Sequence, residues 1–152
     1  MNVRHRKPRR AFSLIELVIV IIIMGVISAI AIPRMMKGAD NADVTGLQAD
    51  LAVLRGAIEM YRYEHAAFPG AATIATQLTT ETQKDGSAWV SGDKYGPYIV
   101  KVPPLKTGAH KGDVGVASIA GPPVGEDAGA IGWLYDSTVG SIWANDSNHF
   151  DK

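Results

Sequence analysis

The chain of 152 residues contains no cysteine. It can therefore form no disulfide, no thiolate metal site and no cysteine nucleophile. Common catalytic motifs are missing as well, because the sequence has no HExxH pair, no phosphate-binding glycine loop and no nucleophile elbow. These absences predict a protein that is not an enzyme and that carries no catalytic cofactor.

The histidines of the chain show no spacing typical of a metal site. They are His5, His65, His110 and His149, and no two of them lie one helical turn apart. We therefore expect each of them to be a solvated surface residue. Nothing in their spacing favours a catalytic pair.

Acidic residues are absent from one end of the chain, although the formal net charge is zero. Residues 1–11 include five basic residues, whereas residues 12–152 include ten basic and fifteen acidic ones. An acidic body argues against a nucleic acid as partner, because such binding depends on Lys and Arg against phosphates. Basic residues beside an apolar span stay on the cytoplasmic side of a membrane, so the body is expected outside the cytoplasm.

A long apolar run follows the basic end. Among residues 12–32, only Ser13, Glu16 and Ser28 are neither apolar nor glycine. A helix of this length spans about 30 Å, the thickness of the hydrocarbon core of a bilayer. Residues 12–33 are therefore predicted to form a transmembrane helix in contact with lipid. Glu16 needs an explanation, because a carboxylate in such a helix costs about 3 kcal/mol.

Two ordinary interpretations of this run leave Glu16 unexplained. A plain single-pass anchor has no use for a buried acid. A cleaved secretory signal peptide fits the basic start, and Ala29-Ile30-Ala31 has the small-x-small form of its cleavage site. A peptide that is discarded has no use for an acid either. The alternative of a membrane-tethered or secreted binding module, which uses the segment only for export, stays open.

The segment Arg10-Ala11-Phe12-Ser13-Leu14-Ile15-Glu16-Leu17 resembles the processing site of type IV prepilins and type II secretion pseudopilins. The resemblance implies that residues 1–11 are a basic leader, removed between Ala11 and Phe12 by a prepilin peptidase. The same enzyme would then methylate the new amino terminus at Phe12. Glu16 would become the fifth mature residue, which in such filaments meets the amino terminus of a neighbouring subunit.

Three more positions bear on the resemblance. Gly25 and Pro33 stand where the family commonly has a glycine and a helix proline, and both are expected to serve assembly. Ala11 departs from the glycine that usually precedes the cut. The family implies a filament of copies of this chain or of other pseudopilins, built from the inner membrane by an assembly platform. The leader would be cytoplasmic and the head periplasmic.

After the apolar run, residues 34–66 are predicted to form an amphipathic helix that continues into the head. Its apolar positions alternate in steps of three and four, which is typical of one buried helix face; they are Val44, Leu47, Leu51, Leu54, Ile58 and Tyr61. Pro33 is expected to kink or loosen the helix near Ala29, whose carbonyl loses its partner. The stripe is expected to pack against the chain's own body.

Residues 67–152 are predicted to form an exported α+β head. Residues 72–84 form a short helix or a loop, residues 98–102 read as one strand and residues 114–119 as another. A β-hairpin is expected near residues 131–145. The fold class is therefore α+β and pilin-like, with a long amino-terminal helix packed on a small antiparallel sheet.

The head resembles that of the major (G-type) pseudopilin less closely. The resemblance rests on Tyr95-Gly96-Pro97-Tyr98 and on the hairpin at residues 132–140. That family binds calcium in its carboxy-terminal loop, and Asn145, Asp146 and Asp151 offer oxygen ligands here. The alternative is a polar, frayed terminus without metal. The sequence does not distinguish a major from a minor subunit, or a secretion pseudopilus from a type IV pilus.

Overall fold

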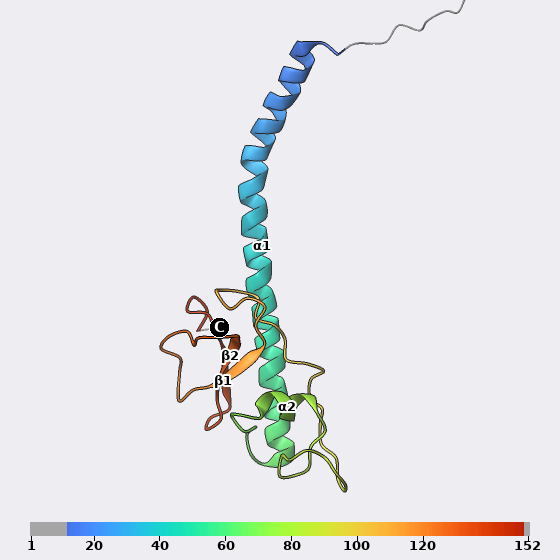
Figure 1. Cartoon of the computed structure of the whole chain (residues 1–152), viewed down its shortest axis with the longest axis vertical. Helices are drawn as coiled ribbons and strands as arrows, with labels where there is room; N and C mark the ends of the chain where they lie inside the picture. Colours follow the sequence, from blue (N-terminus) through green and yellow to red (C-terminus); the bar gives the residue numbers. More distant parts are fainter. Residues whose placement is uncertain (1–11, 151–152) are drawn as a thin grey trace, which may run out of the picture. The chain divides into compact units, whose positions relative to one another are not determined.

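The computed structural model describes residues 12–150, so the expected leader and Asp151 lie outside the described residues. The chain divides into two compact units, Met1–Asp40 and Asn41–Lys152. One helix, α1 (Leu14–His65), belongs to both units (Figure 1).

Helix α1 is continuous from its cap to its end. The helical assignment continues through Pro33, so the missing N–H costs Ala29 one hydrogen bond without ending the helix. The helix ends at His65, where the next residue, Ala66, has a left-handed φ of 57°. A residue in this conformation commonly follows the last turn of a helix.

The head contains a second helix and a three-stranded sheet. Helix α2 (Ile74–Thr79) lies in the segment for which a short helix or a loop was expected. The strands are β1 (Gly115–Ser118), β2 (Ile131–Asp136) and β3 (Ser141–Ala144), in the order β1-β2-β3. The predicted hairpin is confirmed, because β2 and β3 pair antiparallel.

The sheet is mixed, not wholly antiparallel as expected. Strand β1 pairs with β2 in the parallel direction, with Ser118 opposite Tyr135. A parallel pair needs a connection of about a dozen residues to carry the chain back. Residues 119–130 provide that connection between β1 and β2. The α+β class itself is confirmed.

The strand predicted at residues 98–102 is wrong. The backbone N–H groups of Tyr98 and Ile99 both donate to the carbonyl of Leu78 in α2, at 2.9 and 3.1 Å. Because these amides are used at a helix end, they pair with no strand. The segment is largely apolar and bends at residues 100 and 101, and it fastens α2 to the head.

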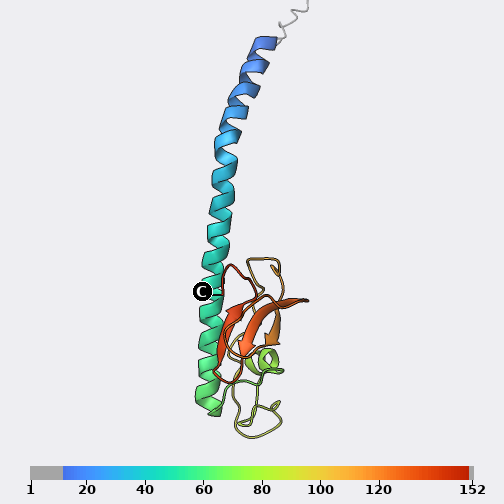
Figure 2. The ribbon, with the colours of Figure 1, turned by 90° about the vertical axis from the view of Figure 1, so that its left-hand side faces the viewer.

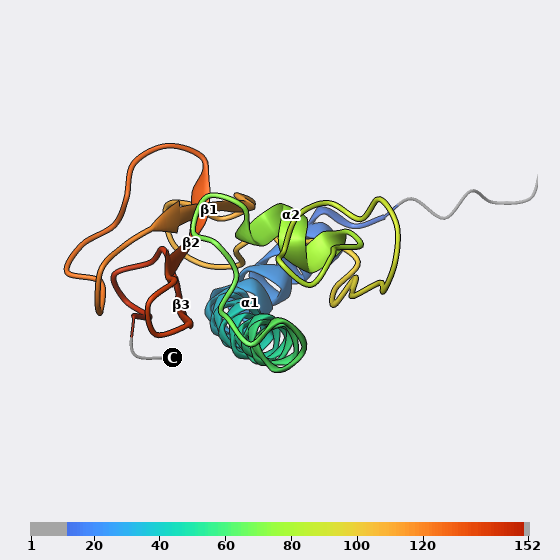
Figure 3. The same cartoon turned by 90° about the horizontal axis from the view of Figure 1, so that it is seen from below.

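The hydrophobic core lies between α1 and the elements of the head. Figures 2 and 3 show the strands and α2 on the same side of the second half of α1. The predicted stripe supplies one wall of this core, and only Val44 at its start is partly exposed. The large core residues are Leu47, Leu51, Leu54, Ile58, Tyr61, Ile74, Leu78, Leu105, Trp133, Tyr135 and Ile142.

Candidate functional site

The apolar segment of α1 exposes its side chains. Phe12 is 85% exposed, Leu14 is 80% exposed and Val20 is still 47% exposed. By length and composition, α1 contains one stretch that could cross a membrane, with a mean hydropathy of 3.0. Large exposed apolar surfaces mark membrane or protein contacts. The segment is therefore suited to lipid or to other helices.

Glu16 has a second role that the sequence analysis missed. Its Oε2 accepts a hydrogen bond from the backbone N–H of Ser13 at 2.9 Å, directly before the helix starts. This is half of a capping box, in which the third helical residue returns to the capping residue. The pattern Ser-x-x-Glu was visible in the sequence. Glu16 therefore helps to start α1, whatever else its charge does.

The other predicted residues of this segment lie as follows. Gly25 lies within the helix, and a Cβ added there would meet no atom within 4 Å. Glycine inside a helix costs about 1 kcal/mol relative to alanine. Within the described residues, no neighbouring atom requires position 25 to lack a side chain. Pro33 lies inside α1. Ala11 lies outside the described residues.

Asn145 is buried and fastens two parts of the head together. Its Nδ2 donates to the carbonyls of Asp127 and Ile131, at 2.9 and 2.8 Å. Its Oδ1 accepts from the N–H of Asp127 at 2.8 Å. The side chain therefore joins the end of β3 to the start of β2. This part of the chain is not the frayed terminus considered above.

Asp146 is also buried, and both of its carboxylate oxygens are used. Oδ2 lies 2.8 Å from Nδ1 of His149, and Oδ1 accepts from the N–H of Asn148 at 3.1 Å. Burial alone would raise the pKa of Asp146, but the hydrogen bonds and the imidazole outweigh it and lower the pKa.

Calcium needs six to eight converging oxygens. Within residues 12–150, no group of three or more His, Cys, Asp or Glu side chains could hold a metal ion. The described candidates therefore do not fit a calcium site, because Asn145 and Asp146 already bond within the chain. Asp151 lies outside the described residues.

This arrangement predicts that calcium leaves the stability of the protein unchanged. If the protein had a calcium site, a free calcium concentration of a hundred times its Kd would raise the free energy of unfolding by about 2.7 kcal/mol. We expect no such rise when the full chain in detergent is unfolded with urea in calcium and in EDTA. Tryptophan fluorescence can report the transition, since all three tryptophans lie in residues 41–152. A clear stabilisation by calcium would contradict the fit described here.

Two aromatic residues of β2 anchor distant loops to the sheet. The Nε1–H of Trp133 donates to the carbonyl of Pro103 at 2.8 Å, and the hydroxyl of Tyr135 donates to the carbonyl of Pro69 at 3.1 Å. Burial raises the pKa of Tyr135 well above its usual range. At the turn after β2, Gly140 has a φ of 72°, and an added Cβ would lie 2.1 Å from the ring of Phe68. The hairpin therefore organises the head.

His65 is buried, which corrects the expectation of a solvated side chain. Its ring stacks on Tyr61 with 3.9 Å between ring centroids. Nδ1 lies 3.0 Å from the carbonyl of Lys84, and Nε2 lies 3.0 Å from the hydroxyl of Tyr98. The signal was present, because His65 follows Tyr61 by four residues and continues the apolar stripe. His110 and His149 are partly buried, and His5 lies outside the described residues.

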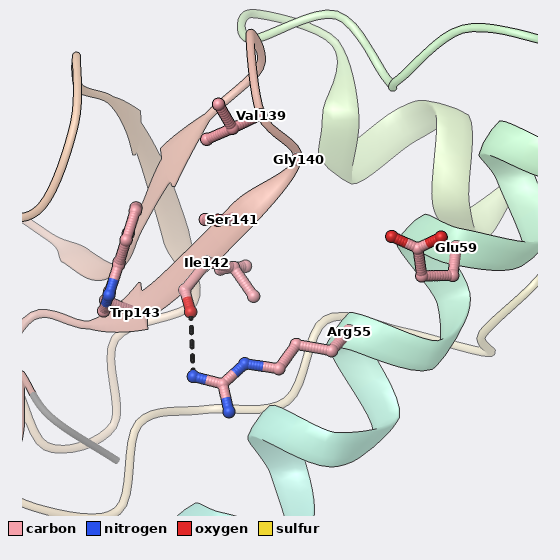
Figure 4. A pocket seen from close by; sticks show the side chains of 7 residues that line it. All are labelled: Arg55, Glu59, Val139, Gly140, Ser141, Ile142 and Trp143. Carbon is pink, nitrogen blue, oxygen red and sulfur yellow. Dashed lines mark hydrogen bonds between the residues drawn. The ribbon is translucent and has the colours of Figure 1, made fainter.

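A hollow of about 340 Å³ lies between the second half of α1 and β3 (Figure 4). Arg55 and Glu59 project into it from the helix, and the Nη2–H of Arg55 donates to the carbonyl of Ile142 at 3.3 Å. This bond covers part of the free edge of β3. Covered edges resist the addition of a foreign strand, so the arrangement protects the sheet and provides no catalytic pair among its lining residues.

Comparison with known proteins agrees with the amino-terminal motif. Residues 6–32 match the family described as the prokaryotic N-terminal methylation motif. The chain is 33% identical over 65 residues to type II secretion system core protein G of Klebsiella michiganensis and to that of Pseudomonas aeruginosa. Each of these matches covers 43% of this chain and 46% of the relative.

A longer match reaches into the head. The core protein G of Vibrio cholerae is 22% identical over 100 residues, which is 66% of each chain. No solved structure matches this chain. The chain spans a little under half the length of the first two relatives. By its methylation motif and these relatives, the chain resembles the prepilin and type II secretion pseudopilin family.

Proposed function

We propose that the protein is a structural subunit of a pseudopilus or type IV pilus-like filament in a type II secretion-type system. One observation carries this proposal. The residues that match the methylation motif, 6–32, include the part of α1 whose apolar side chains are exposed and whose first turn contains Glu16. An exposed apolar helix with one acid at its start suits assembly better than simple anchoring.

The processing step forms the first part of the proposal. A prepilin peptidase removes residues 1–11, cuts between Ala11 and Phe12, and methylates Phe12. Phe12 is exposed at the start of the described chain, so a new terminus there would be accessible. Glu16 lies one helical turn further on, where its carboxylate can meet the ammonium of a neighbouring subunit. Gly25 and Pro33 complete the proposed assembly face.

Location and partners form the second part. The apolar half of α1 waits in the inner membrane with the basic leader in the cytoplasm and the head outside. Copies of this chain or other pseudopilins are then stacked by an assembly platform. The role is structural, not enzymatic. A tethered or secreted binding module would be the second possibility, but Glu16 and the exposed Phe12 would then serve no purpose beyond the helix start.

The decisive experiment is the intact mass of the protein from its native membranes, with fragmentation of its amino terminus. We expect a chain that starts at Phe12 and carries one extra methyl group. A start at Ile32 would indicate an ordinary secreted domain cleaved after Ala31. An intact Met1 would indicate a tethered module. Either of these two results would contradict the proposal.

A further inference from the structure

Buried side chains hold the loop between β1 and β2 by hydrogen bonds near both ends. At its start, the N–H of Gly121 donates to Oδ2 of Asp136 at 2.7 Å, and at its far end Asn145 bonds both backbone groups of Asp127. Asp136 and Asn145 are buried. Hydrogen bonds from Thr138 and from the N–H of Gly121 lower the pKa of Asp136, so it stays ionised to hold the loop.

The tip of this loop is an apolar residue in full contact with solvent. Val124 is 104% exposed and follows Pro122 and Pro123, which restrict the backbone. After Gly125 come two acids, Glu126 and Asp127, and residues 119–130 contain no basic side chain. Single exposed apolar residues are ordinary, but here two buried polar side chains are used to position one. A preorganised loop loses little entropy on binding.

A complementary hollow lies elsewhere on the head. It has a volume of about 450 Å³ and is lined by α2, by residues 100–102 and by Val114, the residue before β1. Val100, Val102 and Val114 form its apolar wall, and Val100 is 95% exposed. Lys101 is the charged residue of its lining. An apolar surface with one cation at its rim suits an apolar tip that is followed by acids.

We propose that the tip at Val124 of one subunit docks in this hollow, beside Val100, of a second copy of the same chain. Glu126 and Asp127 then face Lys101 across the contact. The inference rests on the filament function proposed above and names one of its interfaces.

The contact must join different subunits head to tail. Figure 3 shows the loop between β1 and β2 on the far side of the sheet from α2, so one head cannot fill its own hollow. A contact between two different patches of identical subunits does not close on itself unless the rotation happens to form a ring. Repetition of this contact therefore produces an open chain of heads that all point in the same direction, which is what a filament requires.

The absence of native cysteine makes cysteine cross-linking a clean test. Val124→Cys and Val100→Cys are placed together in the full chain and expressed in the native host, and mild oxidation follows. A disulfide forms only when the two Cα atoms come within about 7 Å. We expect a ladder of cross-linked subunits from the double variant, and no cross-link from either single variant. The matched control joins Val100→Cys to Val139→Cys, an exposed valine on the hairpin turn, and should give no ladder.

The outcomes separate this inference from the proposed function. Filaments visible by electron microscopy without the ladder would overturn the docking contact and leave the filament function standing. Cross-linked subunits without filaments would support the contact and overturn the filament function. The absence of both would overturn both. A ladder from the control pair as well would show random collision and also overturn the contact. In the double variant, Lys101→Glu should weaken the ladder severalfold, because it places a third acid against the loop.

Discussion

Glu16→Gln should reduce incorporation into filaments by roughly a hundredfold while leaving the protein in the membrane. Glutamine keeps the capping interaction with the N–H of Ser13, because either Glu or Gln can occupy that position of a capping box. What the variant removes is the negative charge. A neighbour's ammonium would then lie unpaired among packed helices, which costs about 3 kcal/mol or more. That cost corresponds to about two powers of ten in an association constant.

The measurement compares filament yield with the amount of protein in membranes. Glu59→Gln is the matched control, because Glu59 is an exposed acid on the same helix that pairs with Arg62 at 3.2 Å, and the variant should assemble normally. Glu16→Ala removes both the charge and the cap. If Glu16→Ala fails while Glu16→Gln assembles normally, the residue serves only to start α1, and the proposed pairing between subunits is wrong.

Asn145→Asp should lower the free energy of unfolding of the head by roughly 3 kcal/mol. The substitution keeps the size of the side chain but replaces the Nδ2 donor with an oxygen. The carbonyls of Asp127 and Ile131 then face a buried negative atom in place of a donor. An unsatisfied buried polar group costs about 1–3 kcal/mol, and more when it is charged.

Urea unfolding of the full chain, followed by tryptophan fluorescence, measures this effect. Asn41→Asp is the control, since Asn41 is exposed on α1 and gains the same charge without losing a buried bond. We expect Asn41→Asp to change stability by less than about 0.5 kcal/mol. If the two variants have the same free energy of unfolding, the hydrogen bonds of Asn145 do not hold the head together.

The parts of the fold that were predictable are those with a strong local signal. The stripe from Leu47 to Tyr61 repeats at helical spacing, and burial of that face confirms it. The hairpin followed from alternating apolar residues around Asp136–Gly140, where the chain must turn. The amino-terminal motif needs only one short segment, so it could be identified without the rest of the structure.

The parts that were missed depend on contacts distant in sequence. Residues 98–102 have the composition of a strand, but their amides are taken by Leu78, which the local pattern cannot show. The parallel direction of β1 depends on how the loop after it returns, and no residue in β1 itself encodes that. His65 was judged by its type, although its position on the helix stripe pointed to the core.

The core of the head also has a consequence for the order of events in folding. The core joins residues 47–61 of α1 to residues 133–144 of the hairpin, which follow much later along the chain. The chain must lose the entropy of closing this long loop before the contacts between its ends can form and stabilise it. The head therefore cannot reach its native state until the chain has been made through residue 144. Until then the apolar stripe of α1 stays uncovered and open to unwanted contacts.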